Sequence, residues 1–78
     1  MKLDLSHNEH LKGIDDGAFD ALANLQVLYI AGANLVTQPK LSNNARLRDL
    51  DMTSNNIKNL YETRFPAGVT RLRLGSNR

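Results

Sequence analysis

The chain has 78 residues, of which 41% are hydrophobic and 23% charged, and its formal net charge at pH 7 is +2. This composition is typical of a globular protein rather than a disordered one, and the length allows one domain at most. The small net charge, with lysines and arginines dispersed among carboxylates, argues against nucleic-acid binding, which requires clustered phosphate contacts.

One pattern of apolar residues recurs along the chain. Its fullest copy reads LRDLDMTSNNI over residues 47–57, and copies shifted by 22 residues read LQVLYIAGANL over 25–35 and VTRLRLGSN over 69–77. A shorter copy, LDLSHNEHL over 3–11, begins the chain. A period of this size indicates a repeat architecture, in which each unit stacks on its neighbours.

The copies resemble the leucine-rich repeat, LxxLxLxxNxL, over essentially the whole chain. The resemblance implies an α/β fold, a right-handed leucine-rich-repeat solenoid forming a slice of a horseshoe. A short parallel β-sheet would line its concave face, with irregular or short helical segments on the convex side. The single repeat region would lack caps and consist of four units, the last partial: 1–24, 25–46, 47–68 and 69–78. We interpret it as a fragment of a longer array of extracellular-type, or typical, repeats.

Each copy begins with a predicted strand and ends with a predicted buried asparagine. In Lys2 to Ser6, polar and apolar residues alternate as in a half-buried strand. The resemblance places the buried asparagines at Asn8, Asn55 and Asn77, where a carboxamide can pair with backbone groups of the turn after the strand.

The second copy departs from this asparagine row. Ala33 takes the place of the asparagine, and Asn34 follows one residue late. A water molecule, a rearranged turn, or an inward shift of Asn34 could satisfy the backbone groups there. In the third copy, Asn56 is expected to face solvent.

The segments that connect the strands are expected to complete the core. In the first, Asp16 is a candidate helix N-cap before AFDALAN (18–24), which predicts one or two turns of helix. In the second, Pro39 disfavours a regular helix, so irregular or extended backbone is expected. A short helical turn is compatible with residues 61–64. By the resemblance, the inward-facing residues of these segments are Ile14, Phe19, Leu22, Leu41, Leu60 and Phe65.

Strand alternation sends a set of side chains outward onto the concave face. This set, the candidate protein-binding residues, is Lys2, Asp4, Val27, Tyr29, Asp49, Asp51, Arg71 and Arg73. In one interpretation, the two aspartates of the third strand form ion pairs with the two arginines of the fourth. In the other, Tyr29 and Val27 form the apolar centre of a docking strip, since tyrosine and arginine are enriched at binding hot spots.

No motif for catalysis or cofactor binding is evident. His7 and His10 lie in the turn after a strand rather than on a helix face, where they could converge with further ligands on a metal. Ser6 and His7 are adjacent in the chain and would point to opposite faces, which argues against a hydrolytic site with Asp4. We therefore predict no catalytic, cofactor-binding or metal-binding residues, no cofactor and no enzyme activity in this chain.

The function implied by the resemblance is that of a protein-protein recognition module. Such a scaffold would bind a protein or peptide of unknown identity through its concave β-face, as part of a receptor-like or signalling protein. Two alternatives are a substrate-recognition arm of a larger enzyme, such as a receptor-type kinase or a ubiquitin ligase, and a structural spacer with no ligand.

The sequence also bears on membrane contact, location and self-association. The apolar runs fall short of the roughly 18 residues that span a bilayer, so no membrane contact is expected from this segment. No signal peptide is evident, yet the repeat type favours an extracellular or cell-surface location. The uncapped ends would expose apolar cross-sections and so favour self-association.

Overall fold

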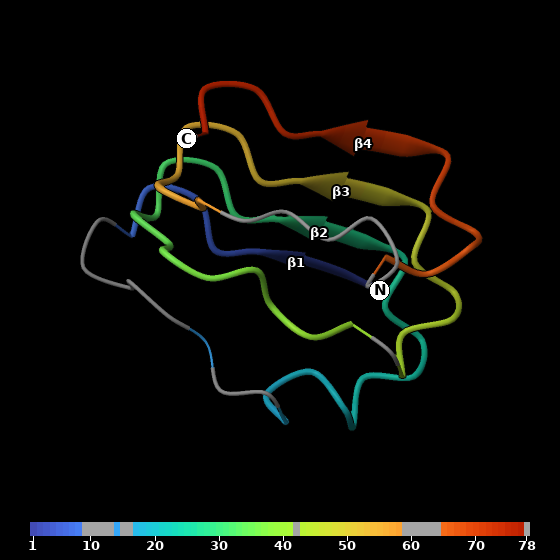
Figure 1. Ribbon diagram of the computed structural model, residues 1–78. Helices are drawn as coiled ribbons and strands as arrows, with labels where there is room; N and C mark the ends of the chain where they lie inside the picture. Colours follow the sequence, from blue (N-terminus) through green and yellow to red (C-terminus); the bar gives the residue numbers. More distant parts are fainter. Residues whose placement is uncertain (9–13, 15–16, 42, 59–64, 78) are drawn as a thin grey trace.

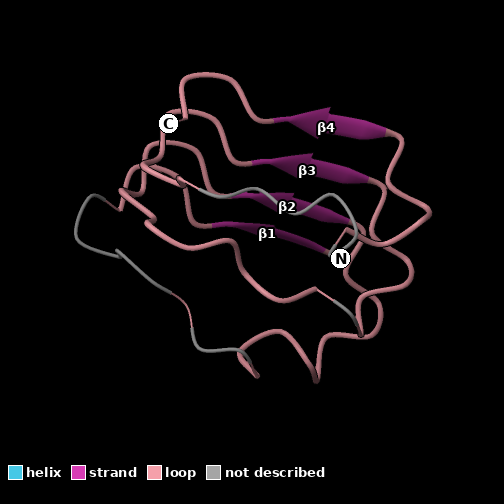
Figure 2. Ribbon diagram, in the orientation of Figure 1, coloured by secondary structure: helices cyan, strands magenta, loops and turns pink. Residues whose placement is uncertain are grey.

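The chain folds as a short solenoid with one strand per turn (Figure 1). The computed structural model describes residues 1–8, 14, 17–41, 43–58 and 65–77. Its strands are β1 (Lys2–Asp4), β2 (Val27–Tyr29), β3 (Asp49–Asp51) and β4 (Arg71–Arg73). They form one parallel sheet in chain order, with equivalent repeat positions in register. The described part of the second connecting segment and residues 17–26 of the first lie away from the sheet (Figure 2). The predicted solenoid slice is confirmed.

The core lies between the sheet and the connecting segments. Leu28 of β2 and Leu50 of β3 are fully buried, each between two half-buried neighbours, which is the predicted alternation. Leu72, the equivalent residue of β4, is 41% exposed, because β4 has a neighbouring strand on one side only within the described residues.

Most of the residues predicted to face inward from the connecting segments do so. Phe19 and Leu41 are buried in the core, while Ile14, Leu22 and Phe65 are partly buried and pack against it. Leu60 and the helical turn considered for residues 61–64 lie outside the described residues. The segment around Pro39 is irregular, as predicted, and the proline itself is buried.

The helix predicted for residues 18–24 is wrong, and the described residues contain no helix at all. They therefore also contain no helix able to cross a membrane. The stretch makes successive tight turns, in which the amides of Asp20, Leu22 and Leu25 donate to carbonyls three residues earlier at 3.2, 3.0 and 3.0 Å. An α-helix would need bonds spanning four residues, and a segment this short gains little from helix propensity alone.

A buried asparagine that the sequence analysis did not identify stabilises these turns. Asn44 is fully buried on the convex side, and its Nδ2 donates to the carbonyls of Phe19 and Leu22 at 3.0 and 3.1 Å. These two carbonyls also accept from the amides of Leu22 and Leu25 in the tight turns. Asn44 thus ties the second connecting segment to the first and stabilises its turns.

The predicted asparagine row satisfies the turns that follow the strands. Asn55 is 3% exposed, and its Oδ1 accepts from the amides of Ala33 and Leu35 at 3.0 and 2.9 Å. Its Nδ2 donates to the carbonyls of Ile30, at 2.7 Å, and Met52, at 3.1 Å. Asn55 therefore binds the backbone of its own repeat and of the preceding one.

Asn77 makes the equivalent bonds, and the row continues across the last repeat as predicted. Nδ2 of Asn77 donates to the carbonyls of Met52 and Leu74 at 2.8 and 2.9 Å, and its Oδ1 accepts from the Ile57 amide at 3.2 Å. The predicted burial of Asn8 is wrong. Asn8 is exposed, because β1 has a neighbouring strand on one side only within the described residues, and its Nδ2 donates to the Leu5 carbonyl of its own repeat at 2.7 Å.

The interruption at Ala33 is accommodated by a rearranged turn. Ala33 is fully buried, and its amide donates to Asn55 Oδ1 of the next repeat. Asn34 adopts a positive φ of 59°, and its Oδ1 accepts a hydrogen bond from Asn56 Nδ2. Asn56 is consequently half-buried, which corrects the expectation that it faces solvent.

One residue in each repeat enables the chain to leave the strand. The position before each asparagine, or before Ala33, has a positive φ: 64° at His7, 67° at Gly32, 58° at Ser54 and 59° at Ser76. This left-handed conformation strains residues with a Cβ. A Cβ at Gly32 would also lie 3.3 Å from His7 Nδ1. Glycine is therefore the least strained choice where the turn passes the His7 ring.

Removal of the Asn55 carboxamide should destabilise the fold. Asn55→Ala leaves buried backbone groups of two repeats without partners, at an expected cost of about 1 to 3 kcal/mol. Asn43 is exposed and provides the matched control, so Asn43→Ala should unfold within about 0.5 kcal/mol of the wild type. Urea unfolding of the three proteins measures both differences. Equal midpoints for the two variants would contradict the assigned repeat register.

Candidate protein-binding face

The eight candidate residues form two columns across the sheet, which we call the concave face. Each alternates with an inward leucine of its strand, so all eight lie on the side opposite the core. Strand register aligns the first column as Lys2, Val27, Asp49 and Arg71, and the second as Asp4, Tyr29, Asp51 and Arg73.

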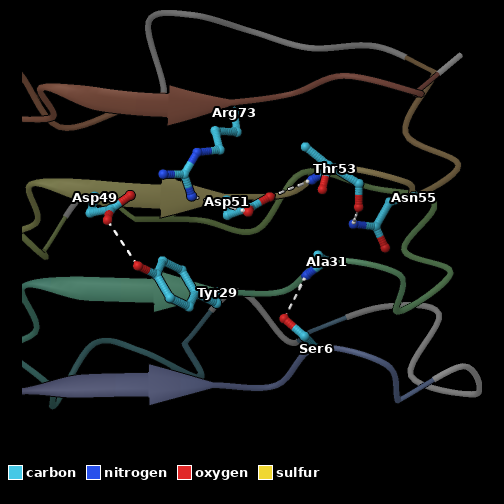
Figure 3. Close-up of polar contacts among 8 residues, drawn as sticks. All are labelled: Ser6, Tyr29, Ala31, Asp49, Asp51, Thr53, Asn55 and Arg73. Atoms are coloured by element: carbon cyan, nitrogen blue, oxygen red, sulfur yellow. Dashed lines mark hydrogen bonds and ion pairs between the residues drawn. The ribbon is translucent and has the colours of Figure 1, made fainter.

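Tyr29 is the central residue of this face, and contacts on both sides hold its ring. Its hydroxyl donates to Asp49 Oδ2 at 3.0 Å (Figure 3). From β1, Lys2 Nζ lies 4.8 Å from the ring centroid, a cation–π geometry. Tyr29 is half-buried. Its two contacts fix the position of the ring in the absence of a partner.

Asp49 bonds to Tyr29 rather than to Arg71. Its second carboxylate oxygen, Oδ1, is buried and has no hydrogen-bond partner among the described residues. The ion pair expected between Asp49 and Arg71 is not formed there, and Arg71 is exposed. An exposed ion pair gains little free energy in water, so the tyrosine hydroxyl can take the carboxylate in its place.

The expected cross-strand ion pair does form in the second column. Arg73 Nη1 lies 3.4 Å from Asp51 Oδ2, with side chains 42% and 17% exposed. The other oxygen, Oδ1, accepts from the Thr53 amide at 3.0 Å. Burial raises the pKa of Asp51, but the hydrogen bonds from Thr53 and the pairing with Arg73 outweigh it, so the pKa lies below its ordinary value of 3.8.

The sequence analysis did not identify the turn residues Ser6 and Thr53 as part of this face. Asp4 Oδ1 accepts from the Ser6 amide at 2.9 Å, and this bond lowers the pKa of Asp4. Ser6 Oγ in turn accepts from the Ala31 amide at 3.0 Å (Figure 3). Asp4 with Ser6 and Asp51 with Thr53 make the same turn, in which a carboxylate caps the amide two residues on. The sequence does contain a signal for this turn, since the pattern Asp-x-Ser/Thr occurs at the same repeat position in the first and third copies.

Comparison with known proteins establishes the family. The profile described as Leucine rich repeat matches residues 1–57. The chain belongs to the leucine-rich repeat family. The Homo sapiens protein Leucine-rich repeat-containing protein 4C is 38% identical over 56 residues, which are 72% of this chain and 9% of that protein. Leucine-rich repeat-containing protein 4 of Rattus norvegicus is 33% identical over 65 residues, 83% of this chain and 10% of that protein. The chain therefore spans about a tenth of the length of these relatives.

The leucine-rich repeat frame explains which side chains are available on the face. The inward side chains pack in the core, and the Ser6 hydroxyl accepts from the Ala31 amide, so neither is available to a partner. Within the described residues, no three His, Asp, Glu or Cys side chains gather in a way that could hold a metal ion. His7 is exposed, whereas His10 lies outside the described residues. The face thus offers an aromatic ring and charges suited to non-covalent contacts.

Replacement of Asp51 should make the fold less sensitive to acid. Because its folded-state pKa is lowered, the ionised carboxylate stabilises the fold above the ordinary value of 3.8, and this stabilisation is lost as pH falls through the lower folded value. The difference in free energy of unfolding between wild type and Asp51→Asn should therefore become smaller as the pH falls below 3.8. Urea midpoints from neutral pH to about pH 2 measure it. Asp20→Asn, at an exposed convex position, is the control, and an unchanged difference for Asp51→Asn would contradict the pairing.

Proposed function

We propose that this leucine-rich repeat chain is a recognition module that binds a protein or peptide through its concave face. The observation that carries the proposal is the Tyr29 ring, held between Lys2 and Asp49 at the centre of the sheet. An aromatic side chain fixed before binding loses little conformational entropy when a partner packs on it. Tyrosine is also among the residue types enriched at the centres of binding surfaces.

The neighbours of Tyr29 support the same proposal. Val27 adds a half-buried apolar side chain on the same strand. Charged residues of β1, β3 and β4 surround this centre. An apolar centre with a polar rim is the usual organisation of a protein interface. The proposal requires no catalytic residue, cofactor or metal ion.

The proposal extends to the setting of the module. We place it in a receptor-like or signalling protein at the cell surface or outside the cell. The spacing of its repeats, which resembles the extracellular type, supports this location. The similarity to two leucine-rich repeat-containing proteins supports a role in protein interaction.

Substitution of Tyr29 should weaken binding at this face. Peptides selected from a phage-displayed random library against the wild-type chain serve as the probe. Tyr29→Ala should weaken their binding by at least about 1 kcal/mol, roughly fivefold in Kd. Tyr29→Phe keeps the ring but loses the bond to Asp49, so it separates the contribution of the ring from that of the hydroxyl.

A control on the convex side separates recognition from folding. Lys40 is exposed, so Lys40→Ala should bind the selected peptides as the wild type does. Tyr29→Ala deprives Asp49 of its donor, so circular dichroism must confirm that each variant is folded. Equal binding by folded Tyr29→Ala and wild type would reject the concave face as the docking surface and favour a spacer.

A further inference from the structure

We infer that the segment recognised by the concave face is an acidic peptide, whose carboxylates bind the guanidinium groups beside Tyr29 at the β3–β4 side of the sheet. This inference rests on the proposed function and specifies the chemistry of the partner. Its basis is the unequal accessibility of the charges on this side of the face: the arginines are exposed, whereas the neighbouring carboxylates are largely buried or already hydrogen-bonded.

The arginines on this side are accessible and incompletely neutralised. Arg71 is exposed, and its side chain makes no hydrogen bond or ion pair with the described residues. Arg73 keeps 42% of its side chain exposed despite its pairing with Asp51. Arg48, just before β3, does not belong to this set, because its guanidinium donates to the backbone carbonyls of Ala45 and Leu47 at 3.3 and 3.2 Å and lies beside Gly68. Only one of the two guanidinium groups of the face is therefore paired with a carboxylate among the described residues.

The two arginines share one strand and one face of the sheet. Arg71 and Arg73 lie two residues apart on β4, so strand alternation sends both side chains to the same side. We call Arg71 and Arg73 the basic corner.

The carboxylates near the basic corner are poorly accessible by comparison. Asp49 Oδ1 is buried, and Oδ2 accepts from Tyr29. The Asp51 side chain is 17% exposed and is bonded by Thr53 and Arg73. A ligand approaching this side therefore meets positive charge first. Guanidinium groups bind carboxylates with two parallel hydrogen bonds, a geometry that a peptide with Asp or Glu can supply.

A peptide fits this surface better than a dense polyanion such as a sulfated saccharide. The basic corner offers two accessible guanidinium groups, which is fewer than the closely spaced negative groups of a dense polyanion would need as partners. The half-buried Val27 and Tyr29 provide apolar contact that a saccharide chain cannot use fully. A peptide can place a carboxylate on the basic corner and an apolar side chain on Tyr29.

The test is the composition and Arg71 dependence of selected peptides. A phage-displayed random dodecapeptide library is selected on the wild-type chain, and affinities of synthetic peptides are measured by titration. We expect Asp and Glu to be enriched over the unselected library. Arg71→Ala should weaken binding at least about tenfold, and added salt should weaken it further. Arg71 has no partner to lose among the described residues, so this variant should fold, and Lys40→Ala is again the matched control.

The outcomes separate this inference from the proposed function. Peptides that require Tyr29 but are not acidic, or that bind Arg71→Ala as well as wild type, would overturn the acidic peptide and leave the docking face intact. Peptides that bind folded Tyr29→Ala as tightly as wild type would overturn both. A heparin oligosaccharide that binds more tightly than the peptides, in an Arg71-dependent manner, would replace the acidic peptide by a sulfated polyanion.

Discussion

Hydrogen bonding of the backbone in the turns after the strands is the constraint on which this fold depends. A chain that turns inward beside a core carries amides and carbonyls away from water, and each unpaired group is costly. Asn55 supplies the partners for the turn of the preceding repeat as well as for its own. Each repeat is thus completed by the next one, which makes stacking a requirement of the backbone as well as of the apolar core.

The candidate binding face inherits its geometry from this constraint. The strands are only three residues long, so few ladder bonds hold their register. Fixed turns on one side and buried leucines beneath keep equivalent positions aligned across the sheet. That alignment places Tyr29 between Lys2 of β1 and Asp49 of β3. A shift of one residue would send these side chains into the core.

Features that follow from the repeat period could be predicted from the sequence. Strand positions, their order and register, the buried leucines, and Asn55 and Asn77 all recur at the same phase, so each copy supports the assignment of the others. The eight outward residues follow from the same alternation.

Features that depend on competition between neighbouring groups could not be predicted in this way. Asn44 has no counterpart in the repeat pattern, yet it bonds to two carbonyls of the tight turns that stand where a helix was expected over residues 18–24. Asp49 could bond either to Tyr29 on one side or to Arg71 on the other, and periodicity does not rank the two. The turn at Ala33 likewise includes a hydrogen bond between Asn34 and Asn56 that the repeat period does not specify.

Amide hydrogen exchange at Ala33 and Leu35 tests most directly whether one repeat completes the backbone bonding of another. Both amides donate to Asn55 Oδ1, whereas the Ile30 amide donates to the Asp51 carbonyl at 2.7 Å within the backbone network. Measured by NMR under native conditions, Ala33 and Leu35 should be protected to the same degree as Ile30, because all three should open only when the repeats separate. Exchange of Ala33 and Leu35 as fast as that of exposed Val36, with Ile30 still protected, would contradict this account.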